Sequence, residues 1–218
     1  FRSSLFHGRD VFMPTEFLHG LYDGGAGASL DDWWNRMLAN PLSAGGFIWA
    51  FADEGIVRDD KNGAIDVAGN LAPDGIVGPY REKEGSFFAV KKIWTPVYLP
   101  LSEMAFLAPT FDGKITLENR YDMTNLNQLK LSWQLVKFGS GVGHTVVAKG
   151  GAEAPDVAAG MRGMTSLALP SDWARQDALY FTATDRDGRE IYTWSWMIAS
   201  ARQVAQRMQP AFPTSASA

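Results

Sequence analysis

Glu16 is the first residue whose type and position could do chemistry. It lies near the end of a short apolar run, VFMPTEF (residues 11–17), and a glycine-rich loop follows. Barrel enzymes hold their catalytic side chains at the C-terminal ends of strands. A carboxylate in that position can attack an electrophilic carbon or move a proton. The local sequence alone favours the simpler interpretation, a glutamate that only caps a strand or pairs with a cation.

Two further side chains could bind a ligand near that carboxylate. His19 follows three residues later, although a loop histidine bonded to the backbone is the simpler interpretation. Trp49 lies near the end of a second apolar run, SAGGFIWAFAD (43–53). Because side chains alternate along a strand, Phe47, Trp49 and Phe51 share one face. The alternation therefore does not separate a binding-site aromatic from an ordinary core residue.

The remaining motifs match no functional pattern. The loop GGAGAS (24–29) lacks the G-x-G-x-x-G spacing of dinucleotide-binding turns and does not directly follow a strand. Ser29 and His19 form no hydrolase dyad, because no G-x-S-x-G elbow is present. A group of acidic residues matches no EF-hand calcium loop and indicates a solvated loop instead. This group comprises Asp53, Glu54, Asp59, Asp60 and Asp66.

The elements that would position these residues alternate between strand and helix. After the run 11–17, Ser29 is a good N-cap, and the acidic residues behind it suit the start of a helix that ends at Asn40-Pro41. The strand 43–53 follows, then a polar segment, 54–81, of a length that is usually functional. A helix over 82–94 completes the order strand, helix, strand, helix, which is typical of a parallel sheet or barrel.

The pattern changes after Pro100 to short alternating strands. Leu129, Leu131, Trp133 and Leu135 share a face, and Asp187-Gly188 is a strong hairpin signal. We expect an antiparallel β-sandwich with Trp133 and Trp194 largely buried. About seven strands are predicted, over residues 104–111, 114–122, 129–136, 144–150, 164–170, 177–185 and 190–198.

Composition limits the classes of partner. The 218 residues carry a net charge of −4, with 46% apolar and 20% charged residues, so no basic surface suggests nucleic acid. No apolar run approaches the roughly 20 residues of a membrane span. The absence of cysteine excludes disulfides and thiol chemistry, but it leaves a periplasmic or a cytoplasmic location open. We predict three parts: 1–98, 99–202, and a Pro/Ala/Ser-rich linker or disordered tail at 203–218.

Two strand–helix units cannot close a barrel, which needs eight. The first half of the chain nevertheless resembles the last two β/α units of a family 2 glycoside hydrolase barrel, and the second half resembles the immunoglobulin-like β-sandwich that follows it in β-galactosidases. The resemblance covers roughly residues 11–200. It lies in PTEFLHGLYDGGAGASLDDWW (14–34), GGFIWAFADEG (45–55), APDGIVGPYREKEGSFFAVKKIW (72–94) and ENRYDMTNLNQLKLSWQLV (118–136).

The resemblance implies a role for four residues. Glu16 falls on the catalytic nucleophile, His19 on a sugar-contacting histidine, and Trp49 on the aromatic floor of the sugar site. Asp74 falls where many relatives have an asparagine that helps to hold a monovalent cation beside the sugar. A carboxylate can also bind a hard cation, so Asp74 is a candidate metal ligand. The family's general acid/base, a glutamate on the fourth barrel strand, has no counterpart in this chain.

The resemblance therefore predicts part of a retaining glycosidase that cleaves terminal β-D-galactosides or oligosaccharides. The resemblance requires no cofactor, and it is compatible with a monovalent cation or Mg²⁺ in the intact enzyme. The expected partners are the sugar and the remaining domains of the parent chain, with a homo-oligomer left open. The alternatives are a non-catalytic sandwich or scaffold, or a β-glucuronidase or β-mannosidase of the same family. The chain alone should be inactive without its acid/base.

Overall fold

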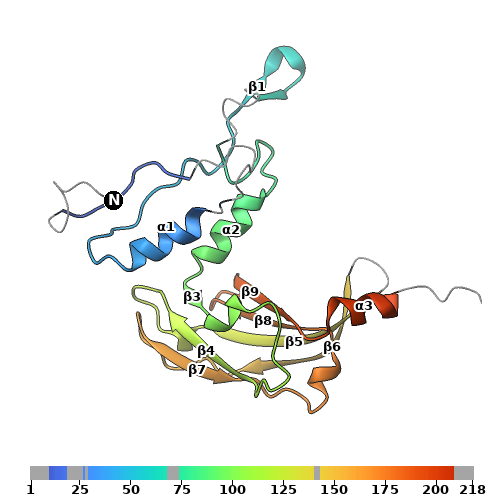
Figure 1. The fold of residues 1–218 in the computed structure, drawn as a ribbon. Coiled ribbons are helices and arrows are strands. Elements are labelled where there is room, and N and C mark those ends of the chain that lie inside the picture. Colours follow the sequence, from blue (N-terminus) through green and yellow to red (C-terminus); the bar gives the residue numbers. More distant parts are fainter. Residues whose placement is uncertain (1–9, 19–26, 28, 68–73, 140–142, 209–218) are drawn as a thin grey trace, which may run out of the picture. The chain divides into compact units, whose positions relative to one another are not determined.

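The chain divides into two compact units, Phe1–Trp94 and Thr95–Ala218. The computed structural model describes residues 10–18, 27, 29–67, 74–139 and 143–208. Figure 1 shows both units, coloured from blue at the N-terminus to red at the C-terminus.

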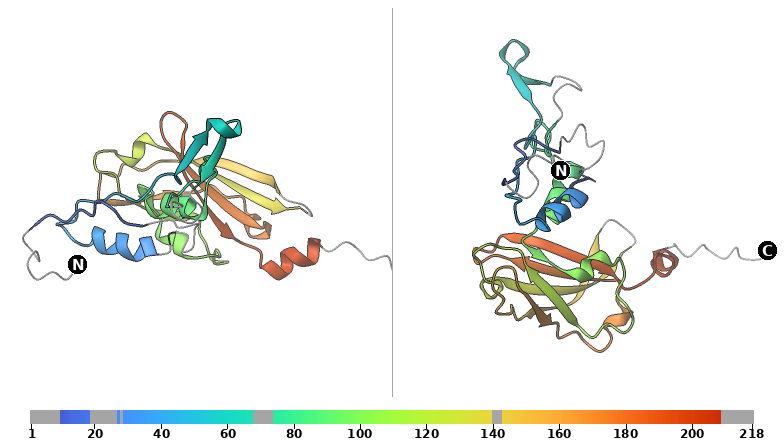
Figure 2. Two further views of the ribbon diagram at one scale, coloured as in Figure 1. Left: turned by 90° about the horizontal axis from the view of Figure 1, so that it is seen from above. Right: turned by 60° about the vertical axis from the view of Figure 1, so that its left-hand side comes forward.

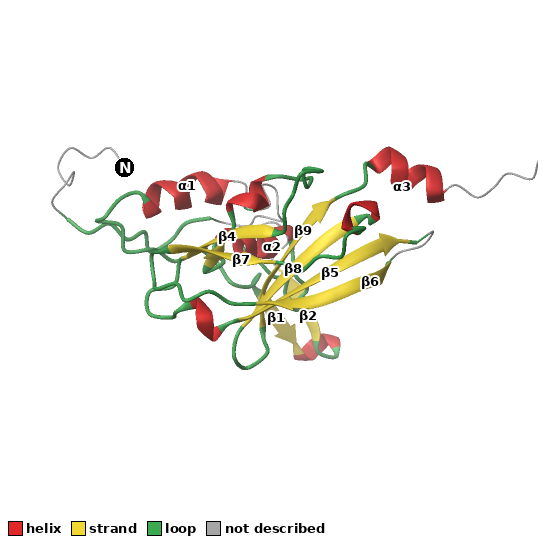
Figure 3. Ribbon diagram, turned by 90° about the horizontal axis from the view of Figure 1, so that it is seen from below, coloured by secondary structure: helices red, strands yellow, loops and turns green. Residues whose placement is uncertain are grey.

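The second unit is an antiparallel two-sheet sandwich, as the alternation predicts. A three-stranded sheet has the order β3-β4-β7, and a four-stranded sheet has the order β6-β5-β8-β9, with the latter strands side by side in Figure 3. Every pairing within the two sheets is antiparallel. The strands are β3 (Val97–Tyr98), β4 (Lys114–Asn119), β5 (Lys130–Phe138), β6 (His144–Ala152), β7 (Arg162–Ser166), β8 (Ala178–Thr184) and β9 (Glu190–Met197).

One predicted strand is wrong. Residues 104–111 form no strand, and only Phe106 makes an isolated bridge to Met197. Their backbone pairs with β9 through two hydrogen bonds, from Leu107 N to Met197 O and from Met197 N to Ala105 O. Pro109 cannot donate to a ladder, which limits further pairing. The seventh strand is instead the two-residue β3.

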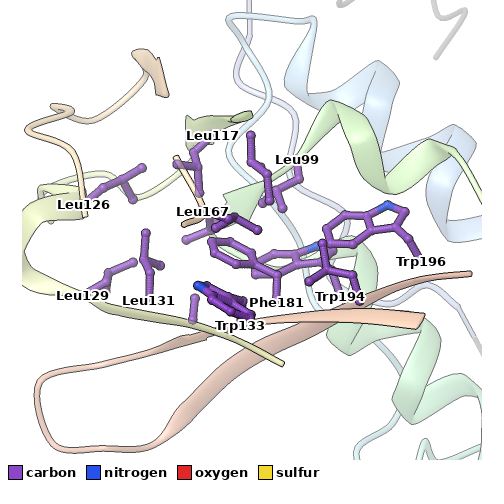
Figure 4. Close-up of a cluster of buried hydrophobic side chains, with 14 of the residues drawn as sticks. Leu99, Leu117, Leu126, Leu129, Leu131, Trp133, Leu167, Phe181, Trp194 and Trp196 are labelled. Atoms are coloured by element: carbon purple, nitrogen blue, oxygen red, sulfur yellow. The ribbon is translucent and has the colours of Figure 1, made fainter. Parts of the chain in front are cut away.

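The core lies between the two sheets, and most of it comes from alternate residues of β4, β5, β8 and β9. Trp133 and Trp194 are 5% and 4% exposed, which confirms their predicted burial. Phe181 is completely buried, with its ring 5.8 Å from that of Trp194 (Figure 4). The Trp196 indole N–H donates to Leu101 O at 2.9 Å, so this buried polar atom is satisfied. Burial of these large rings stabilises the sandwich.

The predicted hairpin joins β8 to β9. Gly188 has φ +84°, the left-handed conformation that glycine adopts without strain. The Asp185 carboxylate accepts the backbone N–H groups of Asp187 and Arg189, both at 2.9 Å. Side-chain acceptors of this kind favour a tight turn.

A short helix, α3 (Ala201–Met208), follows β9 where the sequence predicts a linker from residue 203. It lies at one end of the sandwich (Figure 2). Arg207 forms an ion pair with Asp177, which is fully buried. The Asp177 carboxylate also accepts the Phe138 N–H at 2.9 Å and lies 3.8 Å from the Lys137 ammonium. The ion pair holds the last turn of α3 against the sandwich.

Asp177→Ala is expected to destabilise the sandwich, because the Phe138 N–H loses its acceptor at a buried position. A buried donor without a partner costs about 1–3 kcal/mol. Asp177→Asn keeps an acceptor oxygen and should lose less. Urea denaturation of both variants measures the difference, and equal stability of the alanine variant and the wild type would contradict it.

The first unit contains two helices and a hairpin in its described residues. They are α1 (Ser29–Leu38), α2 (Gly85–Ile93), and a hairpin of β1 (Gly55–Arg58) and β2 (Ala64–Val67). The extended strands predicted over 11–17 and 43–53 are not observed, because these segments meet only at isolated parallel bridges. The described residues therefore show no barrel.

The predicted polar loop 54–81 is not irregular throughout. Its first part is the β1–β2 hairpin, whose turn uses Asn62 and Gly63 at positive φ. Two exposed apolar residues, Ile56 and Val57, lie on β1. Within the hairpin, the Arg58 guanidinium bonds the carboxylates of Asp60 and Asp66.

Candidate functional site

The segment that carries Glu16 runs parallel to the segment that carries Trp49. The Phe17 N–H donates to Phe47 O at 3.2 Å, and the Trp49 N–H donates to Phe17 O at 2.8 Å. Phe17 and Ile48 are bridge partners. This pairing brings Glu16 and Trp49 to neighbouring positions at the same ends of two parallel segments.

A third segment lies on the other side of the Trp49 segment. The Ala50 N–H donates to Asp74 O at 2.6 Å, and the Asp53 N–H donates to Val77 O at 2.9 Å. The bridge from Ala52 to Val77 is also parallel, and the Trp49–Ala50 peptide bond is cis. Three of the four residues selected from the sequence thus lie on adjacent backbone segments.

The two faces of these segments differ. Phe17 and Ile48 pack against the buried cluster of Leu30, Ile76 and Val90, which α1 and α2 help to form. The alternate residues face away and are exposed. Phe47, Trp49 and Phe51 are 60%, 44% and 64% exposed, and Glu16 is exposed too. The helix-covered face is therefore a core, and the opposite face presents a carboxylate beside aromatic rings.

Asp74 is half-buried, and its backbone carbonyl accepts a hydrogen bond from the Ala50 N–H. His19 lies outside the described residues. The roles assigned to Glu16, His19, Trp49 and Asp74 stay predictions.

Asp53 is a residue whose place the sequence does not reveal. The acidic-loop interpretation makes it solvated, but it is half-buried, and its carboxylate accepts the Gly75 N–H at 2.8 Å. The two residues are 22 positions apart, so no local pattern links them. Their spacing carried no recognisable signal.

The rest of the acidic group confirms the solvated interpretation for the hairpin. Arg58 donates to Asp60 at 2.7 and 2.8 Å and also bonds Asp66. The hydrogen bond from Arg58 holds the pKa of Asp60 below its usual range. In the part of the chain that the structure describes, no three His, Asp or Glu side chains gather into a possible metal site. The acidic residues of the hairpin therefore do not form a metal centre by themselves.

The sandwich has a separate cavity of about 550 Å³ beside α3. It is open and polar, and it lies at the end of the sandwich where Asp177 anchors α3. Its lining residues are Ala174, Arg175, Gln176, Ile198, Ala199, Gln203, Gln206 and Arg207. Across the described residues, no helix combines the length and apolar character needed to cross a membrane.

By its fold the second unit is an antiparallel β-sandwich domain. Residues 115–205, which include most of that sandwich, match the family model described as β-galactosidase, domain 4. Residues 115–205 are therefore similar to domain 4 of β-galactosidases, which supports a β-galactosidase-type fragment.

Curated relatives agree with this relationship. The β-galactosidase of Actinobacillus pleuropneumoniae is 25% identical over 139 residues, which is 60% of this chain and 13% of that protein. The β-galactosidase of Pseudoalteromonas haloplanktis is 27% identical over 135 residues, 57% of this chain and 13% of that protein. That of Priestia megaterium is 24% identical over 149 residues, 63% of this chain and 14% of that protein. The chain thus spans only about an eighth of the length of these relatives.

Among solved structures, the exo-chitosanase CsxA of Amycolatopsis orientalis aligns with 70% of this chain and 15% of its own, at 13% identity and a TM-score of 0.35. Its complex with PNP-β-D-glucosamine, determined on a D469A variant, gives the same values. Such a score is too low to support an inference about function.

Proposed function

We propose that this chain contributes to a retaining β-galactosidase of glycoside hydrolase family 2, with Glu16 as its nucleophile. The first unit then supplies the last two β/α units of the catalytic barrel, and the sandwich follows them in the chain. His19, Trp49 and Asp74 contact the sugar or a cation beside it. Other domains of the parent chain complete the site.

One observation carries this proposal: Glu16 and Trp49 end two parallel segments and lie on the exposed face, while the opposite face packs on helices. In a β/α barrel, helices cover one face of each strand, and the catalytic groups project from the strand ends. An exposed carboxylate beside aromatic rings suits a sugar, because rings stack on the apolar face of a pyranose. The relationship to β-galactosidases through residues 115–205 supports the same conclusion.

The chemistry needs two carboxyl groups about 5–5.5 Å apart across the anomeric carbon. Glu16 attacks that carbon while the partner acid protonates the departing oxygen, and the glycosidic C–O bond breaks. The product is a galactosyl ester on Glu16. Water then attacks the same carbon as the partner takes its proton, and Glu16 leaves as a carboxylate. Two inversions give net retention.

The test compares the full-length parent protein with the 218-residue chain on an aryl β-galactoside. The parent should turn the substrate over, and proton NMR should show β-galactose as the first product. The chain should be inactive, because general acid catalysis contributes about 10²–10⁴-fold and its carboxyl group is missing. Turnover by the purified chain, free of host enzyme, would contradict the proposal that the acid/base carboxyl group lies in another part of the parent protein.

The same comparison separates the rival functions. If the parent cleaves an aryl β-glucuronide or β-mannoside instead, the proposed substrate is wrong and the proposed mechanism stands. A parent without any glycosidase activity would leave the sandwich as a scaffold or binding module.

A further inference from the structure

We infer that Asp53 is a positioning residue that holds Asp74 beside Trp49. This inference rests on the proposed function, because it explains how one side of that sugar site is fixed. It assigns to Asp53 a role that neither the acidic-loop pattern nor the proposed mechanism includes.

Asp53 and Ala50 form a bracket of two hydrogen bonds, one to each polar atom of the peptide group between Asp74 and Gly75. The Ala50 N–H donates to the carbonyl of this group at 2.6 Å. The Gly75 N–H, which belongs to the same group, donates to Asp53 Oδ1 at 2.8 Å. This peptide group is therefore bonded at both atoms to the segment 50–53. Because the bracket fixes the peptide plane on one side of the Asp74 α-carbon, it limits where the Asp74 carboxylate can reach.

Gly75 is required by the closeness of this contact. A Cβ atom built on Gly75 would lie 2.2 Å from Asp53 N and 2.4 Å from Ala52 C. Backbone atoms cannot yield as a flexible side chain can, so any larger residue would push the two segments apart. The bracket therefore depends on both the carboxylate of Asp53 and the missing side chain of Gly75.

The segment behind the bracket is itself well fixed. Ile76 and Val77 are 5% and 3% exposed, and both donate their N–H groups to Phe51 O at 3.2 Å. The Glu84 N–H donates to Ile76 O at 3.3 Å and thereby ties the segment to the start of α2. Asp74 is half-buried and lies at the start of this fixed segment, next to the peptide group that Asp53 holds.

The test uses the full-length parent enzyme and an aryl β-galactoside. Asp53→Ala should lower kcat/KM by about 10- to 100-fold, mainly through KM, because a misplacement of about 1 Å can cost 10²-fold. Asp53→Asn keeps an oxygen acceptor for Gly75 and should restore KM. Asp60→Ala removes an exposed carboxylate of the hairpin and is the matched control, expected to leave KM unchanged. If the alanine variant does not fold, Asp53→Leu, which fills a similar space without an acceptor oxygen, is measured instead.

The decisive comparison repeats Asp53→Ala in an Asp74→Ala background. If Asp53 acts through Asp74, the second substitution should add little to the first, which is the non-additivity of coupled residues. Fully additive losses, or an Asp53→Asn variant as impaired as Asp53→Ala, would overturn the inference while the active wild type upholds the proposed function. A wild-type parent without glycosidase activity would overturn both.

Discussion

Glu16→Gln in the full-length parent enzyme is expected to lower turnover of an aryl β-galactoside by several orders of magnitude. The amide keeps the shape of the side chain but cannot form the glycosyl ester, so the covalent step is lost. Glu16 is exposed, and exposed substitutions usually change stability by no more than about 0.5 kcal/mol. The loss should therefore appear in kcat and in kcat/KM, with an unchanged melting temperature.

The matched control is Glu54→Gln. Glu54 is also an exposed glutamate, and it follows the neighbouring segment 43–53. It should retain near-normal turnover. If the two variants are equally active, or if Glu16→Gln loses activity only together with its folded structure, Glu16 is not the nucleophile.

Phe181→Ala is expected to cost about 3–5 kcal/mol of the free energy of unfolding of the sandwich, the usual loss for a large core aromatic. Its ring is fully buried and lies against Trp194, so removal leaves a cavity as well as lost apolar burial. Since domains are stable by only about 5–15 kcal/mol, this variant should fold marginally. Urea denaturation followed by Trp fluorescence measures the shift in midpoint.

Phe106→Ala is the control for that measurement. It deletes the same atoms from a residue that is 50% exposed, and its bridge to Met197 uses only the backbone. Its loss should be much smaller. Equal losses for the two variants would show that burial in the core does not set the cost.

The sandwich was predictable because its central strands, such as β5 and β8, each have one buried face. A strict alternation of apolar and polar residues then appears in the sequence, as in Leu131, Trp133 and Leu135, and fixes which side chains enter the core. The hairpin was predictable for a local reason, since Gly188 supplies the positive φ that the turn needs. Residues 104–111 are apolar without being a strand, because apolar residues also cover a sheet edge.

The first unit was less predictable because its order depends on long-range contacts. The helix predicted from residue 82 begins at Gly85, since the Glu84 N–H bonds Ile76 and Lys83 bridges Val77. The contact of Asp53 with Gly75 crosses 22 residues and has no local pattern.

The same limit applies to the candidate site. The sequence singles out Glu16 and Trp49 by their place in two apolar runs and by resemblance. Only the backbone pairing between the segments 11–17 and 43–53 brings them together. Their exposure was not evident from the sequence, because the alternation of Phe47, Trp49 and Phe51 also fits a core.

The most direct test of the central claim is the identity of the residue that carries the sugar. The full-length parent enzyme is incubated with a fluorinated galactoside that slows hydrolysis of the glycosyl ester, then digested and analysed by mass spectrometry. A fluorogalactosyl label is expected on the peptide that contains PTEFLHG, at Glu16, and no such label is expected in the Glu16→Gln variant. A label on any other carboxylate would contradict the assignment of Glu16 as the nucleophile.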